Sequence, residues 1–123
     1  MNEPNGTPIT VTSENATSHA RLYDNATARD LMSLLPLTLT FKDYNRVEKL
    51  SRLPRALSIQ GMPRGAGAVP GDIGYYAPSN DLVFYYRAVG YFPGITRIGH
   101  FDDSMDVIAR QTGDFTVSIE LAH

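Results

Sequence analysis

The sequence of 123 residues contains no cysteine and no tryptophan. Without cysteine there are no disulfide bonds, no thiolate metal sites and no cysteine nucleophile. Eleven basic residues stand against thirteen acidic residues, so the formal net charge is only −2. A chain without excess positive charge has no general attraction for nucleic acid or for anionic lipid. No run of about eighteen apolar residues is present to cross a membrane. We therefore expect neither nucleic acid nor a membrane among its partners.

The remaining composition is typical of a soluble globular protein, with 42% hydrophobic and 20% charged residues. The length fits one domain. Residues 1–7 are polar and include Pro4 and Gly6, which predicts a flexible N-terminal arm, followed by a single domain over residues 8–123. The first residues lack the basic and apolar regions of a secretory signal. We therefore expect a cytoplasmic protein.

Alternation of apolar and polar residues with a period of two recurs along the chain and predicts β-strands. The clearest cases form a first hairpin around a polar turn at residues 14–17, a second hairpin around Pro78, and single strands elsewhere. The predicted strands cover residues 9–12, 20–23, 37–44, 72–77, 82–87, 95–101 and 115–122. Residues 44–70 are rich in proline and glycine, and we expect short strand pieces there, with a mobile loop at residues 61–70. Residues 88–94 are interpreted as another loop.

Two segments change to the helical period. In the first, residues 24–36, Thr27 and Asp30 have the spacing of a capping box, and Asn25 in an N-x-T triplet is assigned to turn or cap chemistry. In the second, residues 102–111, Asp102 or Asp103 is expected to cap the helix. Both helices are too short to cover a parallel sheet. The pattern therefore predicts a mainly β protein, an antiparallel barrel of seven or eight strands with two short helices.

The segment GDIGYYAPSNDLVFYY, residues 71–86, carries four tyrosines in two adjacent pairs. Alternation places Tyr75 and Tyr86 on the core face of the predicted hairpin. It places Tyr76, Tyr85 and Arg87 together on the opposite face. We interpret this opposite face as a surface of aromatic rings turned towards solvent.

Several segments resemble cyclophilins. Residues 96–111, TRIGHFDDSMDVIARQ, resemble the closing part of cyclophilins, and the turn at Ala77 and Pro78 resembles the Gly-Pro turn of their hairpin. LLPLTLTFKDY, LPRALS, GDIGYYAP and GYFPGITRIG together resemble a small bacterial family of cyclophilin-like domains with no established activity. The resemblance covers residues 8–122. It implies a closed eight-stranded antiparallel barrel with a groove on its outer wall.

Cyclophilins isomerise X-Pro bonds with the arginine of a Phe-His-Arg motif, which polarises the amide. This sequence has no Phe-His-Arg motif and no groove tryptophan. We therefore expect a domain that binds a small molecule or peptide without isomerase activity. One alternative is a peptidyl-prolyl isomerase using Arg55 or Arg52, which lie in the corresponding region. A second alternative is a structural or oligomerising domain.

The candidate ligand-binding residues are aromatic and guanidinium side chains, a combination that suits a ligand with a flat or apolar part and an anionic part. They are Tyr76, Tyr85, Arg87, Tyr91, Phe92 and Arg55. Alternatively, Tyr76 and Tyr85 only stabilise the hairpin as cross-strand neighbours, or contribute to a dimer contact, so the protein is expected to be a monomer or a homodimer. His100 has no second ligand at metal-site spacing, and we expect neither a metal nor a cofactor.

Overall fold

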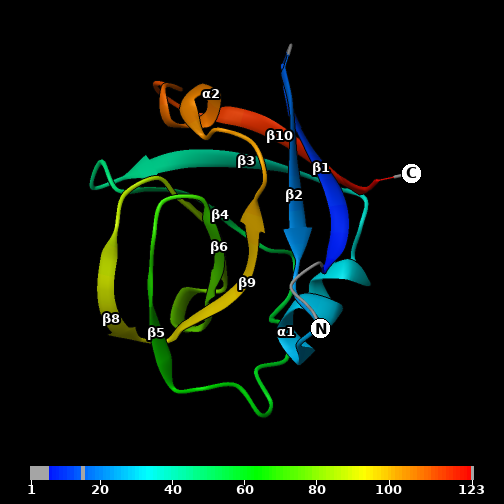
Figure 1. The fold of residues 1–123 in the computed structure, drawn as a ribbon, viewed down its shortest axis with the longest axis vertical. Helices are drawn as coiled ribbons and strands as arrows, with labels where there is room; N and C mark the ends of the chain where they lie inside the picture. The colour runs from blue at the N-terminus through cyan, green and yellow to red at the C-terminus, as the bar shows by residue number, and fades with distance from the viewer. Residues whose placement is uncertain (1–5, 15, 123) are drawn as a thin grey trace.

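The computed structural model, which describes residues 6–14 and 16–122, is a closed antiparallel barrel (Figure 1). Eight strands close it in the order β1-β10-β3-β4-β7-β6-β9-β2. Their bounds are β1 (Thr7–Ser13), β2 (Ala16–Leu22), β3 (Leu37–Tyr44), β4 (Glu48–Arg52), β6 (Asp72–Tyr76), β7 (Asp81–Tyr85), β9 (Ile95–Phe101) and β10 (Phe115–Leu121). The predicted fold class is confirmed. Most of the predicted N-terminal arm, residues 1–5, lies outside the described residues, and Thr7 already belongs to β1.

Period-two alternation fills the barrel with side chains, as a small closed barrel requires. In β10 the interior residues Phe115, Val117 and Ile119 are buried, while Thr116 and Glu120 between them are exposed. At the centre the ring of Phe41 stacks on that of Phe84 with centroids 4.5 Å apart. Phe101 meets Phe84 edge-on at 5.1 Å. These offset and edge contacts are the favoured geometries of aromatic pairs.

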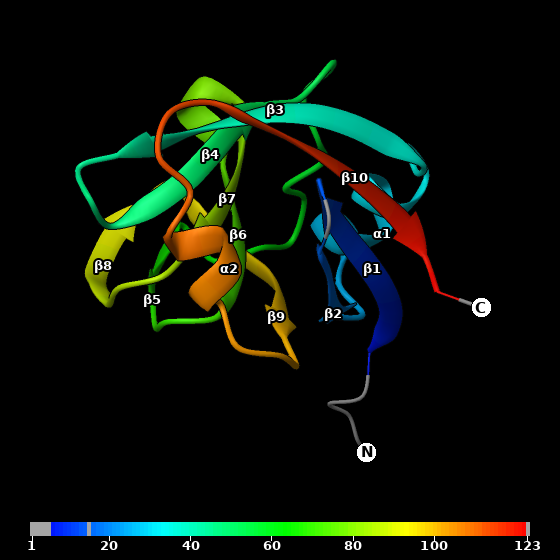
Figure 2. The same ribbon diagram turned by 90° about the horizontal axis from the view of Figure 1, so that it is seen from above.

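Two further strands, β5 (Gly65–Ala68) and β8 (Val89–Pro93), form a separate antiparallel sheet beside the barrel (Figures 1 and 2). The predictions of a loop at residues 61–70 and of another at 88–94 were therefore wrong over these strands. The glycines reflect close packing between the strands. A Cβ on Gly65 would lie 2.5 Å from the carbonyl oxygen of Phe92, and one on Gly67 would lie 2.9 Å from that of Val89. Only glycine allows such an approach.

Helix α1 (Ala26–Met32) and helix α2 (Asp106–Ala109) lie near opposite ends of the view in Figure 1. Ala28 and Leu31 of α1 and Ile108 of α2 are buried in the core. The cap of α1 is Asn25, whose side chain accepts a hydrogen bond from the backbone N–H of Ala28 at 2.8 Å. The predicted capping box of Thr27 and Asp30 is absent, because each of these side chains binds Ser58 of the neighbouring connection instead.

The predicted caps of α2 are also corrected. Asp102 pairs with Arg21, and Asp103 accepts hydrogen bonds from the backbone and ring of His19. Both carboxylates therefore join the β9–α2 connection to β2. The first turn of α2 is bonded by the Ser104 hydroxyl, which accepts from the backbone N–H of Asp106 at 3.1 Å.

A charged cluster fills the barrel end that α2 covers. Lys49 of β4 is 1% exposed and points into the barrel. Its Nζ donates to the carbonyl oxygen of Gln111 at 2.6 Å and lies 3.1 Å from a carboxylate oxygen of Asp43. The ring of Tyr86 lies 5.4 Å from this ammonium, and the Tyr86 hydroxyl donates to Asp43. The buried lysine is thus fully partnered, as an interior charge requires.

Candidate functional site

A pocket of about 440 Å³ lies on the outer wall of the barrel, beside the β5–β8 sheet. This volume is within the range of small-molecule sites. Strands β3, β4, β6, β7, β8 and β9 and their turns all contribute to it. The lining residues are Tyr44, Asn45, Val47, Glu48, Leu50, Tyr76, Ser79, Asp81, Tyr85, Val89, Phe92 and Ile95.

The outer face of the β6–β7 hairpin is covered rather than open to solvent. Tyr85 is 1% exposed and Val83 is fully buried. They form a second hydrophobic cluster with Ala68 of β5 and Ile95 of β9. The alternation of the hairpin was predicted correctly, with Tyr75 buried in the barrel core and Tyr86 packed against it. The predicted solvent exposure of Tyr85 was wrong, because β5 and β8 add a second layer outside the barrel.

Glu48 and Tyr85 form one polar part of the pocket wall, beside Asn45, Ser79 and Asp81. They are directly opposite each other in the antiparallel β4–β7 pair, so their side chains share a face. Among the described residues, neither the Glu48 carboxyl nor the Tyr85 hydroxyl has a hydrogen-bond or ion-pair partner. A half-buried carboxyl and a buried phenol therefore meet in the pocket with their hydrogen-bonding capacity unused.

The surroundings of Glu48 favour its neutral form. Burial raises the pKa of Glu48 to about 7, and the negative charges of Asp81 and Asp43 add to the effect. Burial also raises the pKa of Tyr85 well above its usual range, with a further contribution from the charge of Glu48. Glu48 is therefore the group in the pocket that changes its charge near neutral pH.

Aromatic rings form much of the remaining wall. Tyr76 and Phe92 lie with their ring centroids 6.0 Å apart, at an interplanar angle of 46°. Phe92 and Tyr44 are each about half exposed, at 50% and 53%. A ligand entering the pocket would cover these two rings, which are otherwise left at the surface.

The structure brings together only part of the predicted binding set. Tyr76, Tyr85 and Phe92 line the pocket. Tyr91, the neighbour of Phe92 on β8, is 67% exposed and lies outside the lining, as does the exposed Arg87. The lining contains no arginine, lysine or histidine among the residues that the structure describes.

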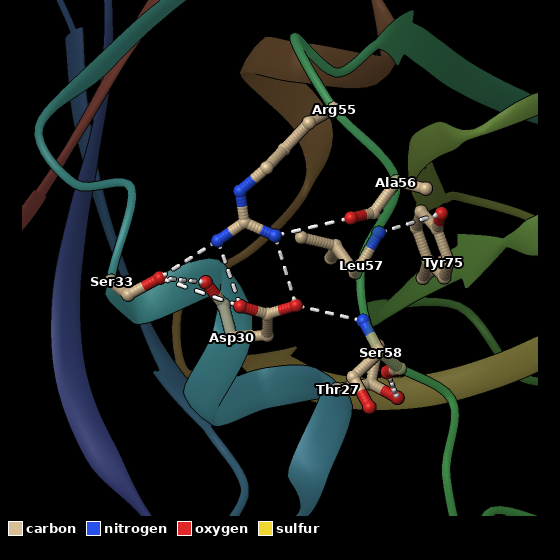
Figure 3. A network of polar contacts seen from close by, with 8 residues as sticks. All are labelled: Thr27, Asp30, Ser33, Arg55, Ala56, Leu57, Ser58 and Tyr75. Atoms are coloured by element: carbon tan, nitrogen blue, oxygen red, sulfur yellow. Dashed lines mark hydrogen bonds and ion pairs between the residues drawn. The ribbon is translucent and has the colours of Figure 1, made fainter.

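Arg55 belongs to a different part of the molecule (Figure 3). Its two terminal nitrogens donate to the two carboxylate oxygens of Asp30 at 2.8 and 3.0 Å, and further to Ser33 and the carbonyl of Ala56. The hydrogen bond from Arg55, with one from the backbone N–H of Ser58, lowers the pKa of Asp30 to about 2. This bidentate pair ties the β4–β5 connection to α1.

The same connection is fixed from the barrel side. The buried Tyr75 hydroxyl accepts from the backbone N–H of Leu57 at 3.0 Å (Figure 3) and donates to the side chain of Asn80 at 2.7 Å. Asn80 in turn donates to the carbonyl of Leu53. Arg55 is therefore part of a structural network, and Arg52, the other candidate, is exposed at the end of β4.

His100 is hydrogen-bonded to a carboxylate. Its Nδ1 lies 2.9 Å from an oxygen of Asp72, which is 1% exposed. Asp72 also accepts from the backbone N–H of Val69 and pairs with Arg97. Over residues 6–14 and 16–122, no three His, Asp or Glu side chains are grouped to hold a metal ion.

Sequence reasoning missed Glu48, Asp81 and Tyr44. In the segment VEKLSR, Glu48 and Leu50 face outward while Lys49 and Ser51 face the interior. The pattern is the reverse of the usual one, since a lysine points inward. The only available signal was the position of this segment between two strands that were predicted clearly.

These observations define a class: a closed antiparallel β-barrel with a ligand-sized pocket on its outer wall. The sequence matches the Cyclophilin-like family over residues 11–120, and the chain belongs to this family. The fold is similar to the solution structure of a hypothetical protein from Archaeoglobus fulgidus, with a TM-score of 0.74 and 18% identity over 99% of this chain and 100% of that one. No curated protein matches the sequence significantly. No helix in the described part of the chain has the length and apolar character needed to span a membrane.

Proposed function

We propose that this cyclophilin-like domain binds a small molecule in the outer-wall pocket and has no prolyl isomerase activity. The observation that carries the proposal is the position of Glu48 opposite Tyr85, two polar groups that have no hydrogen-bond partner among the described residues, in a pocket lined largely by aromatic and aliphatic side chains. Buried polar groups are normally hydrogen-bonded, and an unsatisfied one costs about 1–3 kcal/mol. A bound ligand would supply the missing partners.

The covering sheet favours a small molecule over a peptide. Because β5 and β8 lie over the hairpin, Val83 and Tyr85 are buried beneath them. The remaining space is a pocket of about 440 Å³ instead of an open wall. A compact ligand fits a space of this size, whereas the covering sheet leaves less of the face open to an extended chain.

Two features argue against isomerase chemistry at this pocket. Isomerisation is assisted by a cation that polarises the amide. The described lining residues include no cationic side chain. The arginine predicted for that role, Arg55, is held by Asp30 in a bidentate pair. In an X-Pro peptide exchange assay we expect no acceleration by the intact protein. Acceleration lost in Arg55→Ala or Arg52→Ala would establish the isomerase alternative instead.

The binding proposal is tested with a metabolite library in a thermal-shift assay. Adjacent residues of β8 provide a matched pair of variants, because Phe92 lines the pocket and Tyr91 does not. We expect compounds that raise the Tm of the wild type to lose most of their effect in Phe92→Ala and to keep it in Tyr91→Ala. Val89→Trp, which fills the pocket, should abolish the effect.

The proposal fails if no compound binds. It also fails if the hits raise the Tm of Phe92→Ala and Val89→Trp as much as they raise the Tm of the wild type. Solution mass separates a third outcome. A stable dimer whose interface includes Tyr44 and Phe92 would favour the oligomerising domain, and we expect a monomer in the absence of ligand.

A further inference from the structure

We propose that the ligand of this pocket is a cation: a protonated amine, or a related N–H-bearing cation, attached to an apolar or aromatic body. The inference rests on the proposed function, since it names the class of molecule that the same pocket would bind. It also reverses the ligand charge expected from the sequence, where arginines were assigned to the site.

The charge of the pocket lining favours a cationic ligand over an anionic one. Two carboxyl groups, Glu48 and Asp81, line the pocket, and the described lining residues include no cationic side chain. Asp43 lies close enough to raise the pKa of Glu48. The nearest buried cation is Lys49, which faces the barrel interior and is already paired with Asp43. An anionic ligand would therefore meet like charges, and a cation would meet opposite ones.

The hydrogen-bonding capacity of Glu48 and Tyr85 favours an ammonium group. Glu48, as a carboxylate, only accepts hydrogen bonds, while the Tyr85 hydroxyl both donates and accepts. An ammonium group has three N–H donors, so it can bond Glu48 and Tyr85 together across the β4–β7 pair. A neutral alcohol offers one donor and no charge. Of these groups, the ammonium satisfies the wall most completely.

The aromatic rings of the pocket lining also favour a cation. Tyr44, Tyr76, Tyr85 and Phe92 all contribute to the lining. The faces of aromatic rings attract cations, and rings gathered around a site are the usual way in which proteins bind ammonium groups. The same rings accept the apolar body of the ligand. One pocket thus offers both the acid and the aromatic surroundings that an amine requires.

Binding of a cation should be linked to ionisation of Glu48. In the free protein Glu48 lies opposite Tyr44 of β3 and Tyr85 of β7, and the negative charges of Asp81 and Asp43 also act on it; none of these groups is a cation. A bound ammonium would favour the carboxylate over the neutral acid. The affinity for an amine should therefore rise between pH 6 and pH 8, as Glu48 loses its proton.

The test uses three probes with the same body: 4-phenylbutylamine, 4-phenylbutanol and 4-phenylbutanoate, titrated into the protein at pH 8 by calorimetry or NMR. We expect the amine to bind about tenfold or more tightly than the alcohol, since hydrogen bonds between charged groups are stronger than those to a neutral group. The carboxylate probe should bind most weakly. Glu48→Gln, which keeps the side-chain shape, should reduce the affinity for the amine to that for the alcohol. Glu120→Gln, on the exposed side of β10, should change nothing.

The results distinguish failure of the cation inference from failure of the proposed small-molecule binding. Equal affinity for amine and alcohol, tighter binding of the carboxylate, or an amine preference that survives Glu48→Gln overturns the cation inference. If none of the probes binds but library compounds bind in a Phe92-dependent manner, the cation inference fails and the pocket function stands. If neither probes nor library compounds bind, both fail. Tyr85→Phe gives a second, independent readout. This substitution should lower the affinity for the amine while leaving the fold intact.

Discussion

The aromatic ring of Tyr85 lies directly against Gly74, where a Cβ would come within 2.7 Å of ring atom Cε2 and 3.4 Å of the hydroxyl oxygen. The absence of a side chain at Gly74 therefore lets the ring approach the backbone of β6, in the cluster that includes Ala68 of β5. This contact sets the position of one wall of the pocket.

Gly74→Ala should displace the Tyr85 ring and narrow the pocket. Overpacking of this kind costs about 1–3 kcal/mol, and we expect a loss of stability in that range by urea unfolding, together with weaker ligand binding. Gly90→Ala is the matched control, because a Cβ on Gly90 meets nothing within 4 Å. An unchanged stability in Gly74→Ala would show that the ring is not held as described.

Glu48 should make the unliganded protein less stable as the pH rises. Its pKa is 4.5 in an ordinary environment and about 7 in the fold, so its contribution is fully present below pH 4.5 and is lost as the pH rises through about 7. Urea unfolding of Glu48→Gln from pH 5 to pH 8 should show a flatter profile than the wild type. Parallel profiles for the two proteins would contradict the burial of this carboxyl group.

Most of the barrel was predictable because its strands have one buried and one exposed face. The strand at residues 115–121 and that at 37–44 follow period-two alternation closely, and both were predicted almost to the residue. The β5–β8 sheet was not, because GAGA has too few side chains to show a period, and glycine and proline ordinarily indicate loops. Its glycines are required by backbone packing, which involves residues more than twenty positions away in sequence.

Asp30 should stabilise the fold down to strongly acidic pH. Arg55 holds its pKa near 2, below the ordinary value of 3.8. Its contribution is therefore present above pH 3.8 and is lost as the pH falls through about 2. Unfolding measured between pH 4 and pH 2 should show a steep loss of stability in the wild type and a shallower one in Asp30→Asn. The same steepness in both proteins would mean that the Arg55 pair of Figure 3 does not persist in solution.

Lys49 should be required for stability at the α2 end of the barrel. Lys49→Met keeps the length of the side chain but leaves the Gln111 carbonyl and the Asp43 carboxylate without the ammonium. We expect a loss of about 1.5–3 kcal/mol by urea unfolding, the value of hydrogen bonds to a charged group. Lys42→Met, on the exposed face of β3, should have little effect. Equal losses in the two variants would argue against the buried cluster.

The site was less predictable than the fold. Alternation assigned Tyr76 and Tyr85 to one face correctly, but it does not reveal whether a second layer covers that face. Phe92 was identified from its aromatic character, whereas Glu48 lies in a short strand whose inward residue is a lysine. Arg55 was assigned to the site by family resemblance, and its actual partner, Asp30, lies on α1, twenty-five residues away in sequence.

The most direct test is an NMR titration of the Glu48 side-chain carboxyl carbon, assigned by its absence in Glu48→Gln. We predict a pKa of about 7 in the free protein. Saturation with 4-phenylbutylamine should lower that pKa by one unit or more, since an adjacent opposite charge lowers a carboxyl pKa by about 1–3 units, and 4-phenylbutanol should not. A carboxyl that titrates near 4.5 in the free protein, and does not respond to the amine, would contradict the account.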